Sequence, residues 1–85
     1  MSDLISETIL DIVSKKLNIR ISESLESEII NKDRAVFSGI IDEIEEELKL
    51  FIGDGLLGDI ETVADLIGVC EQLEADKAEQ KGKNG

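Results

Sequence analysis

Few residues of this 85-residue chain could act as nucleophiles or metal ligands. The chain has no histidine and one cysteine, Cys70, so a histidine-based triad, the usual catalytic metal centre and a thiolate zinc cluster are excluded. Cys70 shares its helical spacing with Leu66 and Ile67, which indicates a small buried side chain. Ser38 has the only hydroxyl group between residues 33 and 52. We therefore predict that the protein is not an enzyme.

The acidic, glycine-containing segment 54–61 is a candidate calcium loop. It lacks the alternating oxygen ligands and the final glutamate at the spacing that an EF-hand requires. We predict no metal site.

Negative charge is concentrated in one part of the chain. Twenty Asp and Glu residues against nine Lys and Arg residues give a formal charge of −11, and residues 42–76 contain twelve of the acids with Lys49 as their only base. A chain with so few cations is a poor ligand for nucleic acid or anionic lipid. No apolar run reaches about 18 residues and no signal peptide opens the chain, so we expect a cytoplasmic protein.

The densest group of acids holds five of them within six residues. They are Asp42, Glu43, Glu45, Glu46 and Glu47. Because Ile40, Ile41, Ile44 and Leu48 form the apolar face of the same helix, the acids must point to solvent. A solvated helix face explains them without any partner. Their density favours the further interpretation of a docking surface that steers the chain toward basic proteins.

The apolar residues that position these side chains recur at three- and four-residue steps, the period of an α-helix. They predict three substantial helices: one capped by Ser2 or Asp3 that ends near Leu17, one from about Val36 to near Gly53, and one that begins at Thr62. The central helix takes its apolar face from Val36, Phe37, Ile40, Ile41, Ile44, Leu48 and Phe51. Thr62 and Asp65 fit a capping box.

Two less regular stretches, 18–32 and 53–59, join these helices. Ser22 could cap one or two helical turns in the first, and Leu56 and Leu57 could hold a short turn on the core in the second. We predict an all-α fold, a small four-helix bundle with three main helices and one short helix. Residues 1–78 would form a single domain. Residues 79–85 have no apolar side chain to bury and are predicted to be a disordered tail.

Two segments of the chain resemble a known family. The segment from Ile44 to Leu48, the acidic glycine-rich loop after it and the segment from Ile60 to Ile67 are similar to the second half of acyl carrier proteins. Those are small, acidic, mostly four-helix proteins whose second helix ends in a glutamate cluster and whose last helix opens with a Thr-Val pair. The resemblance covers roughly residues 3–75 and implies a bundle of the acyl-carrier-protein type.

The chemistry of that family rests on one serine. In an Asp-Ser-Leu motif at the start of the second helix, the serine hydroxyl carries a 4′-phosphopantetheine arm, whose thiol holds an acyl group. A helix N-terminus favours the negative charge of the phosphodiester. The carrier itself performs no catalysis and presents its cargo to enzymes.

Two registers relate this chain to the motif, and we favour the first. Matching Glu45–Glu47 and Thr62-Val63 without gaps places Asp33 on the aspartate, Arg34 on the serine and Ala35 on the leucine. In this register Ser38 takes a position that is usually apolar, and the first loop must be about four residues shorter than is usual in the family, which surface loops tolerate. Arginine has no nucleophilic oxygen and stays protonated, so it could not accept the arm.

The second register matches the first half of the chain without gaps and makes Ser38 the attachment site. It places Asp42 and Glu45 at positions that are usually apolar, which would bury unpaired charge at a high cost. An ordinary N-cap or small helix-face residue is the simpler interpretation of Ser38, but the attachment role stays open.

The resemblance implies an acyl-carrier-like protein of fatty-acid or polyketide-type biosynthesis that lacks the phosphopantetheine arm at the usual position. It would dock through the five acids onto basic patches of acyl-transfer or synthase enzymes and act as a monomer. Two alternatives stay open: a working carrier with 4′-phosphopantetheine on Ser38, and an acidic helical interaction module unrelated to acyl metabolism. Relatives can shelter an acyl chain in the interior, lined here by Ile9, Val13, Ile40, Ile44, Val63 and Ile67.

Overall fold

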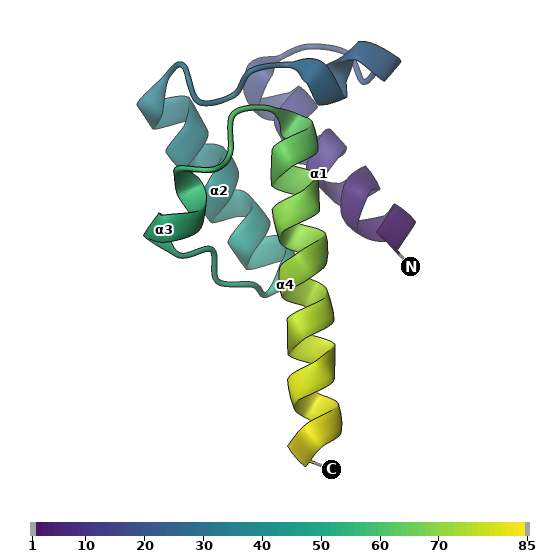
Figure 1. The fold of residues 1–85 in the computed structure, drawn as a ribbon. Coiled ribbons are helices and arrows are strands. Elements are labelled where there is room, and N and C mark those ends of the chain that lie inside the picture. The colour runs from purple at the N-terminus through teal and green to yellow at the C-terminus, as the bar shows by residue number, and fades with distance from the viewer. Residues whose placement is uncertain (1, 85) are drawn as a thin grey trace.

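A computed structural model describes residues 2–84, and within these residues the chain is helical, with no β-strand (Figure 1). The elements in chain order are α1 (Ser2–Leu17), the 3-10 helix η1 (Glu23–Ser27), α2 (Arg34–Leu48), α3 (Asp54–Leu57) and α4 (Val63–Asn84). The prediction of an all-α fold with three main helices and one short one is confirmed. The first helix ends at Leu17, as predicted, whereas the predicted cap by Ser2 or Asp3 depends on side chains outside those that the structure describes.

The core lies where α1 packs against both α2 and α4. All six side chains expected to line the interior are buried there: Ile9, Val13, Ile40, Ile44, Val63 and Ile67. Leu25 of η1 is also buried, because η1 packs against α1 and α4. Each fully buried Ile or Leu contributes about 1.5–3 kcal/mol relative to its exposed state.

Helices α1 and α2 end in the same way, with one residue in the left-handed conformation. Asn18 and Lys49 both have φ of 57°. In each case the next N–H group donates back across the helix end, from Ile19 to the Ser14 carbonyl at 3.0 Å and from Leu50 to the Glu45 carbonyl at 3.2 Å. These bonds satisfy carbonyl groups that the helix leaves without partners.

The predicted continuation of the central helix to near Gly53 is therefore wrong. The chain turns at Lys49 and runs on in extended form, so that Leu50 and Ile52 face the core while Phe51 points outward. Side chains two residues apart share a face of an extended segment, whereas three- or four-residue steps share a helix face. Phe51 fits the helical spacing of the apolar face, but it is 80% exposed.

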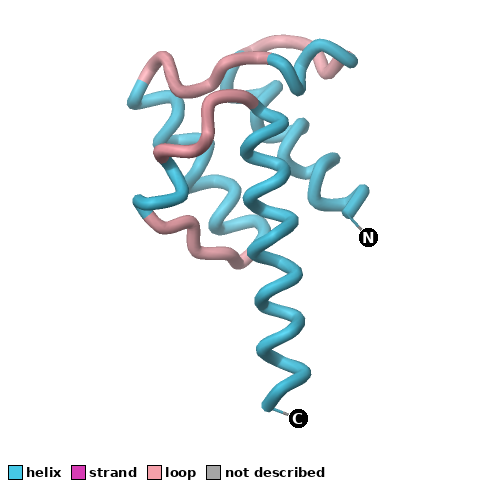
Figure 2. The backbone as a smooth tube through the Cα atoms, in the orientation of Figure 1, coloured by secondary structure: helices cyan, strands magenta, loops and turns pink. Residues whose placement is uncertain are grey.

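A short backbone pairing holds the segment between η1 and α2 against the start of α4 (Figure 2). The N–H of Ile30 donates to the Glu61 carbonyl at 2.9 Å, and the N–H of Val63 donates to the Glu28 carbonyl at 3.1 Å. Ser22 precedes η1 but does not cap it through its side chain. Its hydroxyl lies 3.0 Å from that of Ser24 instead.

The predicted capping box opens α4. The N–H of Asp65 donates to the Thr62 hydroxyl at 3.3 Å, and the Asp65 carboxylate accepts in return from the N–H groups of Glu61 and Thr62. This reciprocal arrangement satisfies donors that the first helical turn leaves without partners.

Helix α4 continues to Asn84 and extends well beyond the other helices (Figure 1). This differs from the predicted disordered tail at residues 79–85, of which the structure describes the backbone to residue 84. Ala, Glu, Gln and Lys are good helix formers, no proline interrupts them, and each added residue extends an existing helix by one hydrogen bond. The overhang agrees with a radius of gyration of 12.9 Å, against about 12 Å expected for a chain of this length.

Candidate functional site

The N-terminus of α2 is capped by Asp33. One oxygen of its carboxylate accepts from the N–H of Ala35 at 3.0 Å and from that of Val36 at 3.3 Å. Arg34 is consequently the first residue of the helix, and its side chain is exposed. A group at this position lies at the positive end of the helix dipole.

Ser38 lies one turn further along α2 and is exposed. It does not cap the helix, because Asp33 does so. Ile40, Ile41 and Ile44 are the buried residues of α2, whereas Asp42 is exposed.

Arg34 and Ser38 both line a groove that we call the α2–α3 groove. It has a volume of about 810 Å³ and runs between α2 and the segment from Phe51 to Gly58. Its apolar lining comes from Phe37, Ile41, Phe51, Ile52 and Leu57, and its charged lining from Arg34, Asp42, Glu45 and Asp54. The groove therefore combines an apolar lining with three carboxylates and one guanidinium.

Phe51 lines the groove, although its helical spacing predicts a place on the apolar face of the central helix. Its ring lies near Gly53, where an added Cβ would come within 3.7 Å of a ring carbon, Cε2. No sequence signal distinguishes it, because Leu50, Phe51 and Ile52 are all apolar and their alternation between core and solvent appears only in the structure.

The five acids expected to form one docking surface face in different directions. Asp42 and Glu45 line the α2–α3 groove, whereas Glu43 and Glu47 line a second cleft of about 500 Å³ between α1 and α2. Glu46 is exposed.

Two of these acids also make contacts within the chain. The Glu45 carboxylate accepts from the N–H of Ile52 at 2.7 Å, and Glu43 pairs with Lys16 at 3.4 Å. Acids on one helix can therefore share a dense stretch of sequence without sharing a surface.

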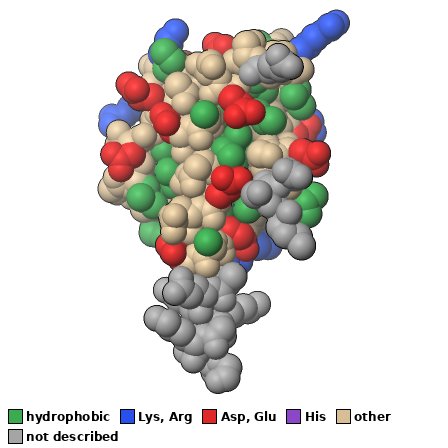
Figure 3. All heavy atoms as spheres, turned by 45° about the vertical axis from the view of Figure 1, so that its right-hand side comes forward, with side chains coloured by type: hydrophobic (Ala, Val, Ile, Leu, Met, Phe, Trp, Pro, Cys, Tyr) green, Lys and Arg blue, Asp and Glu red, His purple; other side chains and the backbone are tan. Residues whose placement is uncertain are grey.

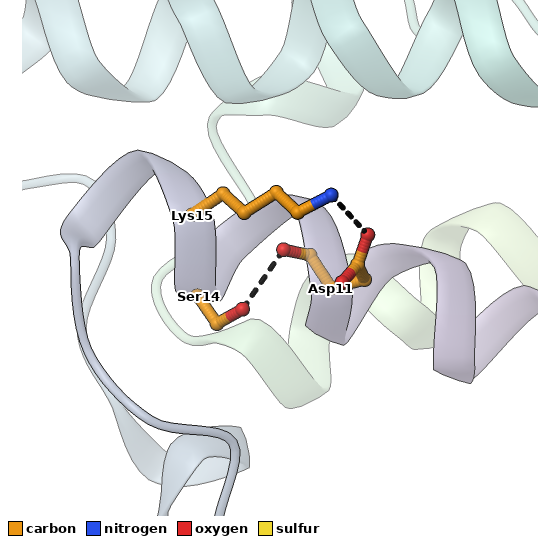
Figure 4. A network of polar contacts seen from close by, with 3 residues as sticks. All are labelled: Asp11, Ser14 and Lys15. Atoms are coloured by element: carbon orange, nitrogen blue, oxygen red, sulfur yellow. Dashed lines mark hydrogen bonds and ion pairs between the residues drawn. The ribbon is translucent and has the colours of Figure 1, made fainter.

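Helix α1 has further polar contacts around Asp11, which lines this cleft together with Lys15 (Figure 4). The ammonium group of Lys15 lies 3.1 Å from the Asp11 carboxylate, and the Ser14 hydroxyl donates to the Asp11 carbonyl at 2.9 Å. The first is an exposed pair one helical turn apart, worth roughly 0.3–0.5 kcal/mol. On the face shown in Figure 3, acidic side chains are interspersed with apolar ones over much of the surface.

Cys70 is fully buried in the core. Burial, with a smaller effect from the nearby charge of Glu71, raises the pKa of its thiol to about 11. The thiol is therefore protonated at neutral pH and is a poor nucleophile. Among the described residues there is no group of three or more Asp, Glu or Cys side chains that could hold a metal ion.

In the part of the chain that the structure describes, no helix combines the length and the apolar character that a membrane span requires. Comparison of the chain with protein-family models, with curated proteins and with solved structures found no match.

Proposed function

We propose that this protein is an acyl-carrier-like interaction protein that has no phosphopantetheine arm at the usual position. It docks onto basic surfaces of acyl-transfer or synthase enzymes. The observation that carries the proposal is the start of α2, where Asp33 caps the helix and Arg34 occupies its first position. In the favoured register, these two residues stand where the family has the aspartate and the serine of its attachment motif.

The burial pattern of α2 supports this register. The alternative register assigns Asp42 and Glu45 to apolar positions, but Asp42 is exposed and Glu45 is only half-buried, with its carboxylate on the Ile52 N–H. The buried positions are instead held by isoleucines. Arg34 has no oxygen that could attack coenzyme A, and its guanidinium stays protonated.

Docking would rest on electrostatic attraction, in the absence of a covalent cargo. Asp42 and Glu46 are exposed on α2, and the chain as a whole has a net charge of −11. Such a surface raises the rate of encounter with a basic partner and loses this advantage as salt screens it. The protein would then compete with, or form a scaffold for, a true carrier.

A second candidate function is that of a working carrier modified on Ser38. The exposure of Ser38 on α2, beside the α2–α3 groove, favours it. Its weakness is that Ser38 lies within the second turn of the helix and not at the N-terminus, where the dipole would favour a phosphodiester.

Incubation of the wild-type chain with coenzyme A and a broad-specificity phosphopantetheinyl transferase, followed by intact mass measurement, separates the two candidates. We expect no change in mass. A gain of one phosphopantetheine that is absent in Ser38→Ala would instead establish the carrier function.

An acidic interaction module unrelated to acyl metabolism is the other alternative. Neighbouring synthase or ligase genes would count against it.

A further inference from the structure

Phe51 is an aromatic side chain that folding leaves in water. It is 80% exposed, although the residues on both sides of it are buried. Its ring borders the α2–α3 groove, together with Phe37, Ile41 and Leu57. Aromatic residues at the edge of a concave apolar surface are the usual anchors of protein interfaces, because they bury a large area at a low entropy cost.

The charges of the groove select the kind of partner. Asp42, Glu45 and Asp54 line it against the single cation Arg34, so the groove is negative overall. It therefore complements a ligand that is both apolar and cationic. An aliphatic carboxylate could pair with Arg34, but three carboxylates in the same groove would repel it.

The backbone of the groove argues for a helical partner. One wall of the groove is formed by residues of α2, a helix of 15 residues whose interior N–H and C=O groups are bonded to one another. On the opposite wall the N–H of Ile52 is already bonded to the Glu45 carboxylate, so a partner strand would find few backbone groups to pair with. An amphipathic helix needs only apolar anchors and flanking charges from such a groove.

We infer that the α2–α3 groove binds a basic amphipathic helix of a partner protein, with Phe51 as the apolar anchor and Asp42 and Asp54 as contacts for its Lys and Arg side chains. This inference deepens the proposed function. It rests on that function in one respect, the identification of the partner as an acyl-transfer or synthase enzyme. The groove itself is tested without any carrier chemistry. Failure of the peptide test below therefore leaves the interpretation of Arg34 untouched. Transfer of phosphopantetheine to the wild-type chain would likewise overturn the proposed function without affecting the groove.

The test uses a synthetic Leu/Lys amphipathic peptide, labelled for fluorescence anisotropy, with a Leu/Glu peptide of the same pattern as its control. We expect the full chain to bind the first peptide and not the second. Phe51→Ser should weaken binding by about tenfold or more, as for interface anchors in general. Asp42→Asn combined with Asp54→Asn should weaken it by about twofold to fivefold and reduce its salt dependence.

Matched variants outside the groove control for non-specific attraction to an acidic protein. Leu4 is a second exposed apolar side chain, at 68% exposure on α1, and Glu7 and Glu26 are exposed acids that do not line the groove. Leu4→Ser and the combined Glu7→Gln and Glu26→Gln changes should affect binding much less than their groove counterparts. Amide shift changes in NMR spectra should concentrate at residues 34–45 and 51–58.

Three results would overturn the inference. The first is the absence of peptide binding, and the second is equal losses in the groove variants and their controls. The third is self-association of the protein that Phe51→Ser abolishes, which would assign the groove to a second copy of the chain. The net charge of −11 opposes that last outcome.

Discussion

The carboxylate of Glu45 accepts a hydrogen bond from the backbone N–H of Ile52 at 2.7 Å, seven residues further along the chain. This bond fastens the extended segment after α2 back onto the helix and, with the left-handed turn at Lys49, directs Ile52 inward and Phe51 outward. One acid of the dense acidic stretch therefore has a structural role.

We predict that Glu45→Ala lowers the free energy of unfolding by about 1–2 kcal/mol, because the partly buried N–H of Ile52 loses its acceptor. Glu45→Gln keeps an oxygen acceptor and should cost less. Chemical denaturation followed by circular dichroism measures both changes. Equal losses in the two variants would show that the charge, and not the hydrogen bond, carries the effect.

Lys49 is the end of α2 and adopts a left-handed conformation that strains a residue with a Cβ. We predict that Lys49→Gly stabilises the fold by about 0.5–1 kcal/mol, after allowance for the greater freedom of glycine in the unfolded chain. Asn18 adopts the same conformation at the end of α1, and asparagine tolerates it better, so Asn18→Gly should gain less. Thermal unfolding compares the two variants. A loss of stability in Lys49→Gly would contradict the strain at this position.

Two glycines lie within helices where a side chain would fit. A Cβ added at Gly39 in α2 or at Gly68 in α4 would meet no heavy atom within 4 Å. Alanine restricts the unfolded chain more than glycine does, so Gly39→Ala and Gly68→Ala should each stabilise the protein by roughly 0.5–1 kcal/mol. Gly53→Ala is the control, because Gly53 lies outside a helix interior and beside the Phe51 ring. This variant should gain less stability. Destabilisation by either helical substitution would mean that the helix packs there more tightly than the structure shows.

Asp65 makes stability depend on pH through its cap of α4. Hydrogen bonds from the backbone N–H groups of Glu61 and Thr62 lower the pKa of its carboxyl from the ordinary value of 3.8. Because the folded-state pKa lies below the unfolded value, the ionised cap stabilises the fold fully above 3.8, and this contribution is lost as the pH falls through the folded-state pKa. Asp65→Asn should therefore destabilise most at neutral pH and progressively less in acid.

Urea unfolding of the wild-type chain and of Asp65→Asn over a pH series measures this difference. Thr62→Val is the control, since it removes an uncharged acceptor of the same capping box at a cost of about 1 kcal/mol. This cost should vary much less with pH, because the Thr62 hydroxyl is the smallest of the causes that lower the pKa of Asp65. A difference between wild type and Asp65→Asn that stays constant into strong acid would contradict the lowered pKa.

The sequence pattern predicts the parts of the fold that depend on local chemistry and on burial. Helical spacing identifies the buried faces of α1, α2 and α4, and the Thr62–Asp65 box marks the start of α4 because the capping residues are themselves the cause of the helix end. The six interior residues are buried for the same reason, since only one face of each helix is apolar enough to enter a core.

The features that the pattern misses depend on tertiary structure. Phe51 continues the helical spacing of α2 by coincidence, and only the turn at Lys49 and the bond from Ile52 to Glu45 remove it from the helix. The pairing of Glu43 with Lys16 joins residues distant in sequence. The α2–α3 groove likewise forms between segments that folding brings together, so its acids could be counted from the sequence but not assigned to one surface.

The most direct test of the central claim, that Arg34 occupies the position of the missing attachment serine, is intact mass measurement of Arg34→Ser after incubation with coenzyme A and a broad-specificity phosphopantetheinyl transferase. Arg34→Ser combined with Ala35→Leu restores the full motif after Asp33 and is measured in parallel. We predict that the serine variants gain one phosphopantetheine while the wild-type chain gains none. A wild-type chain that gains the arm on Ser38, or a double variant that stays unmodified, would contradict the claim.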